Sequence, residues 1–304
     1  MQLQQTISRE IRCVGVGLHS GQRIQLVLKP APADSGITFR RTDVSSPEIP
    51  ARLEFVSDTN HATTLSRGRC VLHTVEHLLA AAWGLGVDNL RVELDAAEVP
   101  IMDGSSAPFV YLLREAGIRH LPRPRRYIKI QEPIGVTEGD KSATLYPHEG
   151  FTISYTIRFD HPLIRRQFER FRILPSSFAD EIAPARTFGF LSEAEALRKA
   201  GLIRGGSLDN AIVLTEAGLL NPALRFKTEF VRHKVLDAVG DLALIGMPIL
   251  GHLVAYKGGH TLHAALANEV LKRTESWSLV TRRELRQQGF LVQPATSRAA
   301  AYRP

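Results

Sequence analysis

One segment of the chain reads Glu229-Phe230-Val231-Arg232-His233-Lys234-Val235-Leu236-Asp237-Ala238-Val239-Gly240-Asp241-Leu242. Its apolar residues recur at steps of three and four positions without a proline, which predicts an amphipathic helix. On that helix His233, Asp237 and Asp241 are spaced by four residues, so they share one face. An imidazole and a carboxylate one turn apart can bind a divalent metal, and both ligand types suit zinc. The same spacing also fits a surface ion pair, so this segment alone leaves both interpretations open.

A second apolar segment covers residues 70–86 and predicts a helix, because alanine and leucine dominate it and glycines follow at its end. Glu76 and His77 lie inside the apolar run, where an unpaired charge would be costly. A carboxylate beside a metal-binding imidazole is well placed to act as a general base. The wider pattern His73-Thr74-Val75-Glu76-His77 is also H-x-x-E-H, the signature of inverzincin peptidases, in which both histidines would bind zinc.

The composition is that of an ordinary folded protein, with 304 residues, 44% hydrophobic and 23% charged, and the length suggests about two domains. The formal net charge of +7 suits an anionic partner such as a phosphate-bearing small molecule, a membrane surface or nucleic acid. Cys13 and Cys70 form no C-x-x-C motif and indicate a reducing compartment. The N-terminus lacks a signal-peptide pattern, and no apolar run is long enough to span a bilayer. We therefore expect a cytoplasmic protein without a transmembrane segment.

Strands are predicted before helices in the first half of the chain. Alternating apolar residues predict a hairpin around the glycine-rich residues 15–21, and another strand at residues 88–94. Residues 107–117 then predict a helix, with a proline in its first turn and a glycine at its end. Residues 119–126 are basic and contain two prolines, which is typical of a linker between domains.

The second half repeats this order. Strands are predicted between residues 127 and 159, and a helix capped by Ser192 is predicted at residues 192–200, before the helix quoted first. This order predicts an α+β protein. We expect an N-terminal domain, a C-terminal domain and a frayed tail, at residues 1–122, 127–292 and 293–304 respectively.

A histidine late in the chain follows a glycine loop, at Lys257-Gly258-Gly259-His260. The loop comes after a predicted strand, and a helix is predicted to begin at Thr261. Held at a helix entrance, the imidazole of His260 is positioned to reach into a cleft. Phe159-Asp160 ends an earlier strand, where the phenylalanine fits either stacking on a base or packing in the core.

Several segments together resemble the UDP-3-O-acyl-N-acetylglucosamine deacetylases, the zinc enzymes that carry out the committed step of lipid A synthesis. The segments occur in the family's order over almost the whole chain. They are Thr74-Val75-Glu76-His77-Leu78-Leu79, Pro100-Ile101-Met102-Asp103-Gly104-Ser105, Ala185-Arg186-Thr187-Phe188-Gly189-Phe190, Gly206-Ser207-Leu208-Asp209-Asn210-Ala211, His233-Lys234-Val235-Leu236-Asp237-Ala238-Val239-Gly240-Asp241-Leu242 and Tyr256-Lys257-Gly258-Gly259-His260.

The resemblance implies two similar domains, each a sheet with helices laid on it, packed face to face with the active site between them. It implies one catalytic zinc ion per chain, bound by His77, His233 and Asp237, with His73 not a ligand. It also implies a monomer that acts on UDP-3-O-acyl-N-acetylglucosamine, releases acetate and leaves the free amine, without a nucleic-acid partner.

The resemblance also implies the catalytic roles. Glu76 would take a proton from water, and Thr187 would donate to the developing oxyanion. His260 would protonate the departing amine or stabilise the oxyanion as imidazolium. Asp241 would orient His260 and raise its pKa. Lys234 matches a family lysine near the reacting water.

For the substrate, the resemblance implies two sets of contacts. The nucleotide and its phosphates would lie near Lys141, Phe159, Asp160, Lys257 and His61, and His19 matches a histidine near the site. The acyl chain would occupy a passage made by an insert at residues 188–213. Its lining would include apolar residues that could equally belong to an ordinary core: Phe188, Leu191, Leu202 and Leu208.

Three other functions are compatible with parts of this sequence. An inverzincin-type peptidase would need His73 for zinc, and a basic nucleic-acid-binding protein would explain the net charge without chemistry. A structural zinc protein would need a closed set of four protein ligands, and the two cysteines do not supply one.

Overall fold

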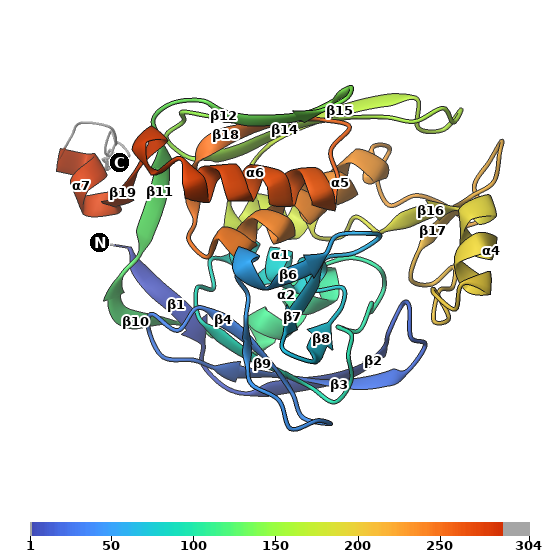
Figure 1. The fold of residues 1–304 in the computed structure, drawn as a ribbon, viewed down its shortest axis with the longest axis horizontal. Coiled ribbons are helices and arrows are strands. Elements are labelled where there is room, and N and C mark those ends of the chain that lie inside the picture. Colours follow the sequence, from blue (N-terminus) through green and yellow to red (C-terminus); the bar gives the residue numbers. More distant parts are fainter. Residues whose placement is uncertain (1, 288–304) are drawn as a thin grey trace, which may run out of the picture.

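The computed structural model describes residues 2–287, and Figure 1 shows two sheets with helices enclosed between them. This is the α+β arrangement expected from the sequence, because each half contributes a sheet and the helices that cover its inner face. The predicted tail at residues 293–304 lies outside the described residues. No helix of the described part is long and apolar enough to cross a membrane.

The sheet of the first half has five strands in the order β2-β3-β9-β4-β5. β2 and β3 form the antiparallel hairpin predicted around residues 15–21, and β4 pairs in parallel with β9. Helices α1 and α2 cover one face of this sheet (Figure 1). The elements are β2 (Ile11–Val16), β3 (Arg23–Pro30), β4 (Ile37–Arg41), β5 (Ile49–Pro50), β9 (Leu90–Leu94), α1 (Glu76–Leu85) and α2 (Ala107–Glu115).

The predicted helix at residues 70–86 is wrong over its first six residues. β8 (Cys70–Leu72) instead pairs with β7 (Thr64–Arg67), which pairs in turn with β6 (Val56–Asp58). Thr74 has a positive φ of 62°, a conformation that α-helices do not contain, so α1 begins only at Glu76. Pairing to a neighbouring strand thus prevails over the local preference for helix.

The predicted linker is also ordered differently, since β10 (Ile118–Pro124) pairs antiparallel with β1 (Leu3–Ile7). The two strands form a sheet of their own, in which each is an edge strand. An edge strand tolerates prolines because its outer side needs no N–H donor. The chain therefore passes between the halves as a strand that is held by the N-terminus.

The sheet of the second half has seven strands, with β12-β13-β18-β11-β19 along one path and β14 and β15 joined to it through β18. Helices α5 and α6 cover its inner face (Figure 1). The elements are β11 (Arg126–Ile130), β12 (Ile134–Glu138), β13 (Lys141–Tyr146), β14 (Phe151–Arg158), β15 (Arg166–Arg172), β18 (Ile249–Tyr256), β19 (Trp277–Thr281), α5 (Glu229–Leu242) and α6 (His260–Lys272).

A smaller unit projects at the right of Figure 1, where β16 (Phe188–Phe190) and β17 (Ile212–Leu214) pair in parallel and α4 (Leu191–Lys199) connects onward from β16. Helix α4 starts one residue before the predicted Ser192 cap, and no side chain caps it. The remaining short elements are η1 (Leu53–Phe55), α3 (Pro175–Ser177), η2 (Phe178–Ile182), η3 (Ala243–Ile245), η4 (Thr274–Ser276) and α7 (Arg282–Gln287).

The two halves meet where α1 crosses α5. Gly240 of α5 faces the backbone of Glu76, and a Cβ at this glycine would lie 2.1 Å from the Glu76 carbonyl oxygen. Only a residue without a side chain permits this approach, because real Cβ contacts are longer. The crossing therefore brings the first turn of α1 against the polar face of α5.

Candidate active site

Three side chains of types that can bind a metal meet at this crossing. His77 comes from α1, and His233 and Asp237 come from α5, with one ligand atom of each lying within 4.8 Å of the others. Asp237 Oδ1 is 3.3 Å from His233 Nε2 and 3.7 Å from His77 Nε2. All three side chains are buried. The cluster exists because each half supplies one part of it.

The donor atoms of this cluster fit a bound cation. Asp237 Oδ1 is buried and has no hydrogen-bond partner among residues 2–287, although it lies between two imidazole nitrogens. A buried carboxylate oxygen without a donor is costly unless a positive charge neutralises it. Two imidazole nitrogens, one carboxylate oxygen and an open fourth position form the usual ligand set of a catalytic zinc site.

The neighbours of the cluster prepare it for a metal. His233 Nδ1 lies 3.0 Å from the carbonyl oxygen of Ala185, and donating that hydrogen bond leaves the Nε2 lone pair directed at Asp237. Burial lowers the pKa of His233 to about 3, which keeps the imidazole neutral. Burial would raise the pKa of Asp237, but the Lys234 ammonium, 2.8 Å from its Oδ2, holds that pKa well below its usual range.

Glu76 is the first residue of α1 and precedes His77 directly. Its side chain is buried, and its Oε2 accepts a hydrogen bond of 3.0 Å from the backbone N–H of Thr63. Burial raises the pKa of Glu76 above that of an ordinary carboxyl group, although the charges of His260 and His77 oppose this. A carboxylate with raised proton affinity beside a metal-binding residue is suited to accept a proton.

A second cluster surrounds Asp241, one turn beyond Asp237 on α5. Its Oδ2 lies 2.8 Å from Nδ1 of both His260 and His263, and its Oδ1 accepts a hydrogen bond of 2.6 Å from Thr63 Oγ1. Burial would raise the pKa of Asp241, but the two histidines lower it far below the usual value. The carboxylate is therefore ionised and accepts three hydrogen bonds.

His260 is the first residue of α6 and faces this carboxylate. Burial alone would lower the pKa of His260, but the charge and hydrogen bond of Asp241, with the charges of Asp237 and Glu76, raise it to about 9. The imidazole is thus protonated at neutral pH. A protonated imidazole near a basic carboxylate provides an acid and a base in one site.

An apolar cavity of about 530 Å³ opens beside the clusters. Phe188 connects the two regions, because its ring centroid lies 6.3 Å from that of His233 and 5.6 Å from Lys234 Nζ. Most of the cavity wall comes from the projecting unit. The predicted residues on its wall are His19, His61, Thr187, Phe188, Leu191 and Leu208. Leu202 is not on the wall, whereas its neighbour Ile203 is.

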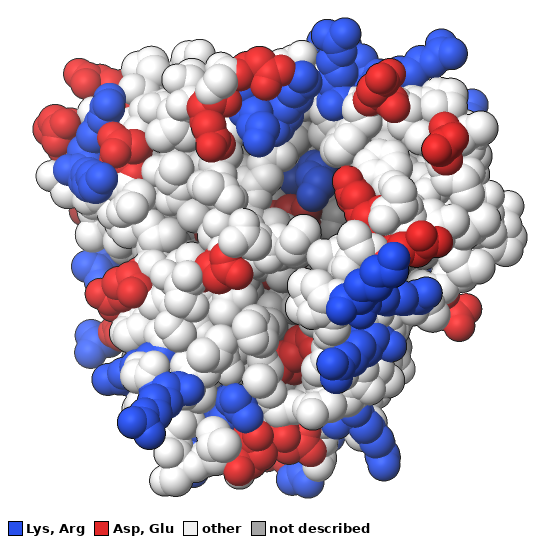
Figure 2. All heavy atoms as spheres, turned by 45° about the vertical axis from the view of Figure 1, so that its right-hand side comes forward, with Lys and Arg blue, Asp and Glu red and all other residues white. Residues whose placement is uncertain are grey.

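A separate basic cleft lies against the end of β14. Phe159, Asp160 and Lys257 line it together with three arginines, Arg158, Arg165 and Arg166. The Phe159 ring also contacts Phe188, with 5.7 Å between centroids, so the cleft adjoins the apolar cavity. Lys257 forms an ion pair with Asp140, and Lys141 follows Asp140 at the start of β13. Figure 2 shows a hollow in the molecular surface with both basic and acidic side chains around it.

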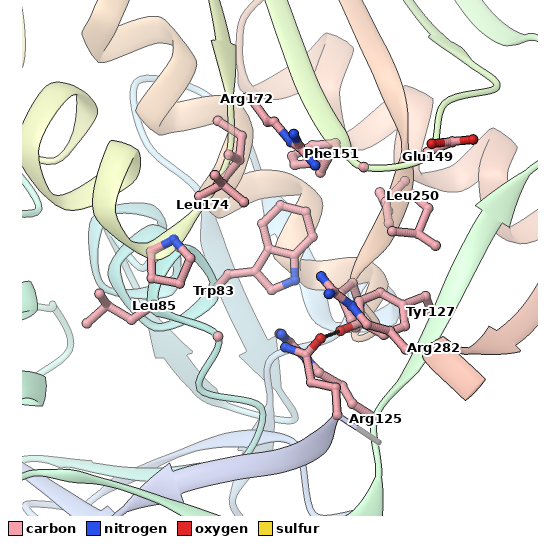
Figure 3. Close-up of a pocket in the computed structure, with 18 of the residues that line it drawn as sticks. Trp83, Leu85, Arg125, Tyr127, Glu149, Phe151, Arg172, Leu174, Leu250 and Arg282 are labelled. Atoms are coloured by element: carbon pink, nitrogen blue, oxygen red, sulfur yellow. Dashed lines mark hydrogen bonds between the residues drawn. The ribbon is translucent and has the colours of Figure 1, made fainter. Parts of the chain in front are cut away.

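Another cavity, of about 200 Å³, lies at the opposite end of α1 and is lined by Trp83, Arg125 and Tyr127 (Figure 3). Arg125 is already engaged there by Asp88, at 2.7 Å. Glu76 and His77 begin the same helix, and a helix rises about 1.5 Å per residue, so this cavity is roughly 10 Å from them. It is not part of the candidate active site.

His73 lies outside the metal-binding cluster. Its side chain is exposed, and its Nδ1 lies 3.1 Å from Thr64 Oγ1. Since α1 begins at Glu76, His73 and His77 do not occupy one helical face, which the H-x-x-E-H arrangement requires. The peptidase alternative is not favoured by this geometry.

The sequence did not predict several residues that complete the site. Thr63 contacts both Glu76 and Asp241 from a loop, and threonine in a loop carries no motif. Helical spacing could have predicted His263, because it lies three residues after His260 on a predicted helix and so near the same face. Its second partner is Tyr155, whose hydroxyl lies 2.9 Å from His263 Nε2.

Comparison with known proteins gives one consistent result. The family model for UDP-3-O-acyl N-acetylglycosamine deacetylase (LpxC) matches residues 4–272. A protein named UDP-3-O-acyl-N-acetylglucosamine deacetylase from Anaeromyxobacter sp. (strain Fw109-5) is 52% identical over 269 residues, covering 88% of each chain. A protein with the same name from Myxococcus xanthus (strain DK1622) is 51% identical over 94% of this chain and 93% of the relative. Another, from Teredinibacter turnerae, is 49% identical over 91% of this chain and 93% of the relative.

Proposed function

Since the chain belongs to the UDP-3-O-acyl N-acetylglycosamine deacetylase family, we propose that it hydrolyses its substrate at a zinc ion held by His77, His233 and Asp237. The enzyme is a hydrolase that removes the N-acetyl group of UDP-3-O-acyl-N-acetylglucosamine in lipid A synthesis. The observation that carries the proposal is the convergence of two imidazoles and an unpartnered carboxylate oxygen from both halves of the chain.

When bound, zinc polarises the amide carbonyl and makes water a stronger acid. The chain supports this chemistry by excluding bulk water, since all three proposed ligands are buried. It also holds His233 in the tautomer that leaves Nε2 free, through the hydrogen bond to Ala185. Lys234 neutralises the second oxygen of Asp237 and fixes the orientation of that carboxylate.

Glu76 is the proposed general base. Its position before His77 places the carboxylate beside the metal-binding cluster, and the Thr63 N–H fixes one of its oxygens. Burial raises its pKa, so the carboxylate has a higher affinity for a proton taken from water. Its neighbour in the other half of the site, His260, is the proposed general acid. Its raised pKa keeps a proton available for the departing amine.

Asp241 orients His260 through Oδ2, and Thr63 in turn fixes Asp241 through Oδ1. Thr187 is the proposed donor to the developing oxyanion. It lines the apolar cavity, and its backbone N–H is fixed by a hydrogen bond of 2.8 Å to Gly104. These contacts keep the polar groups in place before the substrate arrives, which lowers the cost of reorganisation during the reaction.

We propose that the acyl chain occupies the apolar cavity, with Phe188, Leu191 and Leu208 on its wall. Leu202 is left out of this proposal, because it does not line the cavity. The uridine and its phosphates fit the adjoining basic cleft. Phe159, Asp160 and Lys257 line that cleft, and Lys141 follows Asp140, the ion-pair partner of Lys257. His19 and His61 line the apolar cavity. The contact between Phe159 and Phe188 joins the two subsites.

We also propose that residues 1–122 and 127–292 form the two domains, with the projecting unit as an insert at residues 188–213. The distribution of the strands supports this division. The five-stranded sheet lies wholly in the first range, and the seven-stranded sheet lies in the second apart from Arg126, the first residue of β11. The cytoplasm is the proposed compartment. Cys13 and Cys70 are free thiols, which suits a reducing environment.

The test is acetate release from UDP-3-O-acyl-N-acetylglucosamine, followed by mass spectrometry with and without a chelator. We expect loss of acetate with the chelator and recovery after zinc is added. Unchanged release in the chelated protein would contradict the assignment of a metal-dependent hydrolase.

A further inference from the structure

His263 is a buried titratable group that the proposed mechanism does not use. It lies one turn after His260 on α6, and its side chain is completely buried. Both ring nitrogens have partners: Nδ1 lies 2.8 Å from Asp241 Oδ2, and Nε2 lies 2.9 Å from the Tyr155 hydroxyl. His263 therefore joins the carboxylate that orients His260 to a tyrosine of β14.

The donors and acceptors of this chain follow from its geometry. Asp241 is ionised and can only accept, so His263 Nδ1 must carry a proton and donate it. Tyr155 is completely buried, and burial raises its pKa well above the usual value, so the phenol keeps its proton. That proton has one acceptor among residues 2–287, His263 Nε2. His263 is thus a neutral imidazole that donates through Nδ1 and accepts through Nε2.

His260 and His263 donate to the same oxygen of Asp241. A carboxylate that accepts an additional hydrogen bond has its charge partly neutralised, and it attracts other protons less strongly. We propose that His263 is a positioning residue that fixes the Asp241 carboxylate and weakens its hold on the proton of His260. The hydrogen bond from Tyr155 to Nε2 is consistent with the tautomer that Asp241 requires. The inference depends on the proposed role of His260 as the general acid.

All charged groups around the two imidazoles enter this argument. His260 faces Asp241 and Asp237 from α5 and Glu76 from α1, and Thr63 Oγ1 lies 3.4 Å from its Nδ1. His263 forms hydrogen bonds with Asp241 and with the Tyr155 hydroxyl. Substitution of His263 therefore acts on His260 through one shared oxygen, and the other groups stay in place.

Three variants separate donation from packing. His263→Leu removes the donor, His263→Asn keeps an N–H near the position of Nδ1, and Tyr155→Phe removes only the hydroxyl. Hydrogen bonds to charged groups are strong, so removing one should change the pKa of His260 measurably. We expect His263→Leu to shift the midpoint of the alkaline limb of the kcat/KM profile upward by about half a unit to one pH unit. His263→Asn should leave that limb at its wild-type position. Tyr155→Phe should lower thermal stability without moving the limb.

A limb that stays in place in His263→Leu, or moves equally in His263→Asn, would overturn the inference and leave His263 a packing residue. Failure of the wild-type protein to release acetate would instead contradict the proposed function.

NMR of ¹⁵N-histidine-labelled protein tests the inference without substrate or a substitution. We expect the ¹⁵N shifts of His263 to show a protonated Nδ1 and an unprotonated Nε2, as its hydrogen bonds to Asp241 and Tyr155 require. The opposite tautomer, or a charged His263, would overturn the inference.

Discussion

Replacing Asp241 with asparagine should remove the proton from His260 at neutral pH. With a pKa of about 9, His260 is about 97% protonated at pH 7.5. Without the carboxylate, only burial and more distant charges act on it, so we expect its pKa to fall to the ordinary value of 6.5 or below. The protonated fraction at pH 7.5 then falls to about 9% or less, a loss of more than tenfold. A shift of this size corresponds to roughly 3 kcal/mol of proton affinity.

The assay has two parts. The first is the kcat/KM profile for acetate release, whose alkaline limb should move from about pH 9 to about pH 6.5 or lower in Asp241→Asn. The second is NMR titration of His260 in the metal-free variant, which reports the imidazole directly. Asp180→Asn provides a matched control, because Asp180 is an exposed carboxylate that belongs to neither cluster. It should leave both measurements unchanged.

The same pair predicts how stability depends on pH. Because the pKa of His260 is raised in the folded protein, its ion pair with Asp241 stabilises the fold fully below about pH 6.5, and this stabilisation is lost as the pH rises through about 9. Urea unfolding of the metal-free protein should therefore show this decline in wild type and not in Asp241→Asn. A His260 that titrates near pH 9 in the variant would refute the reasoning, because Asp241 would then not be the cause of its raised pKa.

The remaining predictions concern the crossing of the two helices. Glu76→Ala should keep its metal and lose about 10²- to 10⁴-fold in kcat, the usual value of a general base, as measured by metal analysis and acetate release; normal activity would remove the base assignment. His233→Ala should lose tight zinc binding while His73→Ala retains it, and the reverse would restore the peptidase interpretation. Gly240→Ala should destabilise the fold by about 1–3 kcal/mol in urea unfolding, because its Cβ would meet the Glu76 carbonyl at 2.1 Å, and an unchanged midpoint would contradict the close approach.

Local sequence was sufficient to predict helix α5 and both of its ends. Its periodicity predicted a helix over residues 229–242, which is where α5 begins and ends. The four-residue spacing of His233 and Asp237 follows from helical geometry alone, so their proximity could be predicted before any fold was known. Strands β13 and β14 of the second sheet were predicted for the same reason, because the alternation along them is a local pattern, whereas β15 and β19 were not predicted.

Contacts between distant residues decided the features that were not predicted. Residues 70–75 favour a helix locally, but β8 gains hydrogen bonds from β7 and buries Leu72. β10 is ordered by β1, which lies more than a hundred residues earlier in the chain. Thr63 and Tyr155 reach Asp241 and His263 only in the folded protein, and no short motif contains them. The resemblance to a family supplied the pairing of His77 with α5, which no local pattern contains.

The central claim is that one metal joins the two halves at the crossing of α1 and α5. Anomalous diffraction at the zinc absorption edge from crystals of the zinc-loaded protein tests it most directly. We predict one strong peak within about 2.0–2.2 Å of His77 Nε2, His233 Nε2 and a carboxylate oxygen of Asp237. A peak at the neighbouring group of Asp241, His260 and His263, with none at the predicted position, would contradict the account.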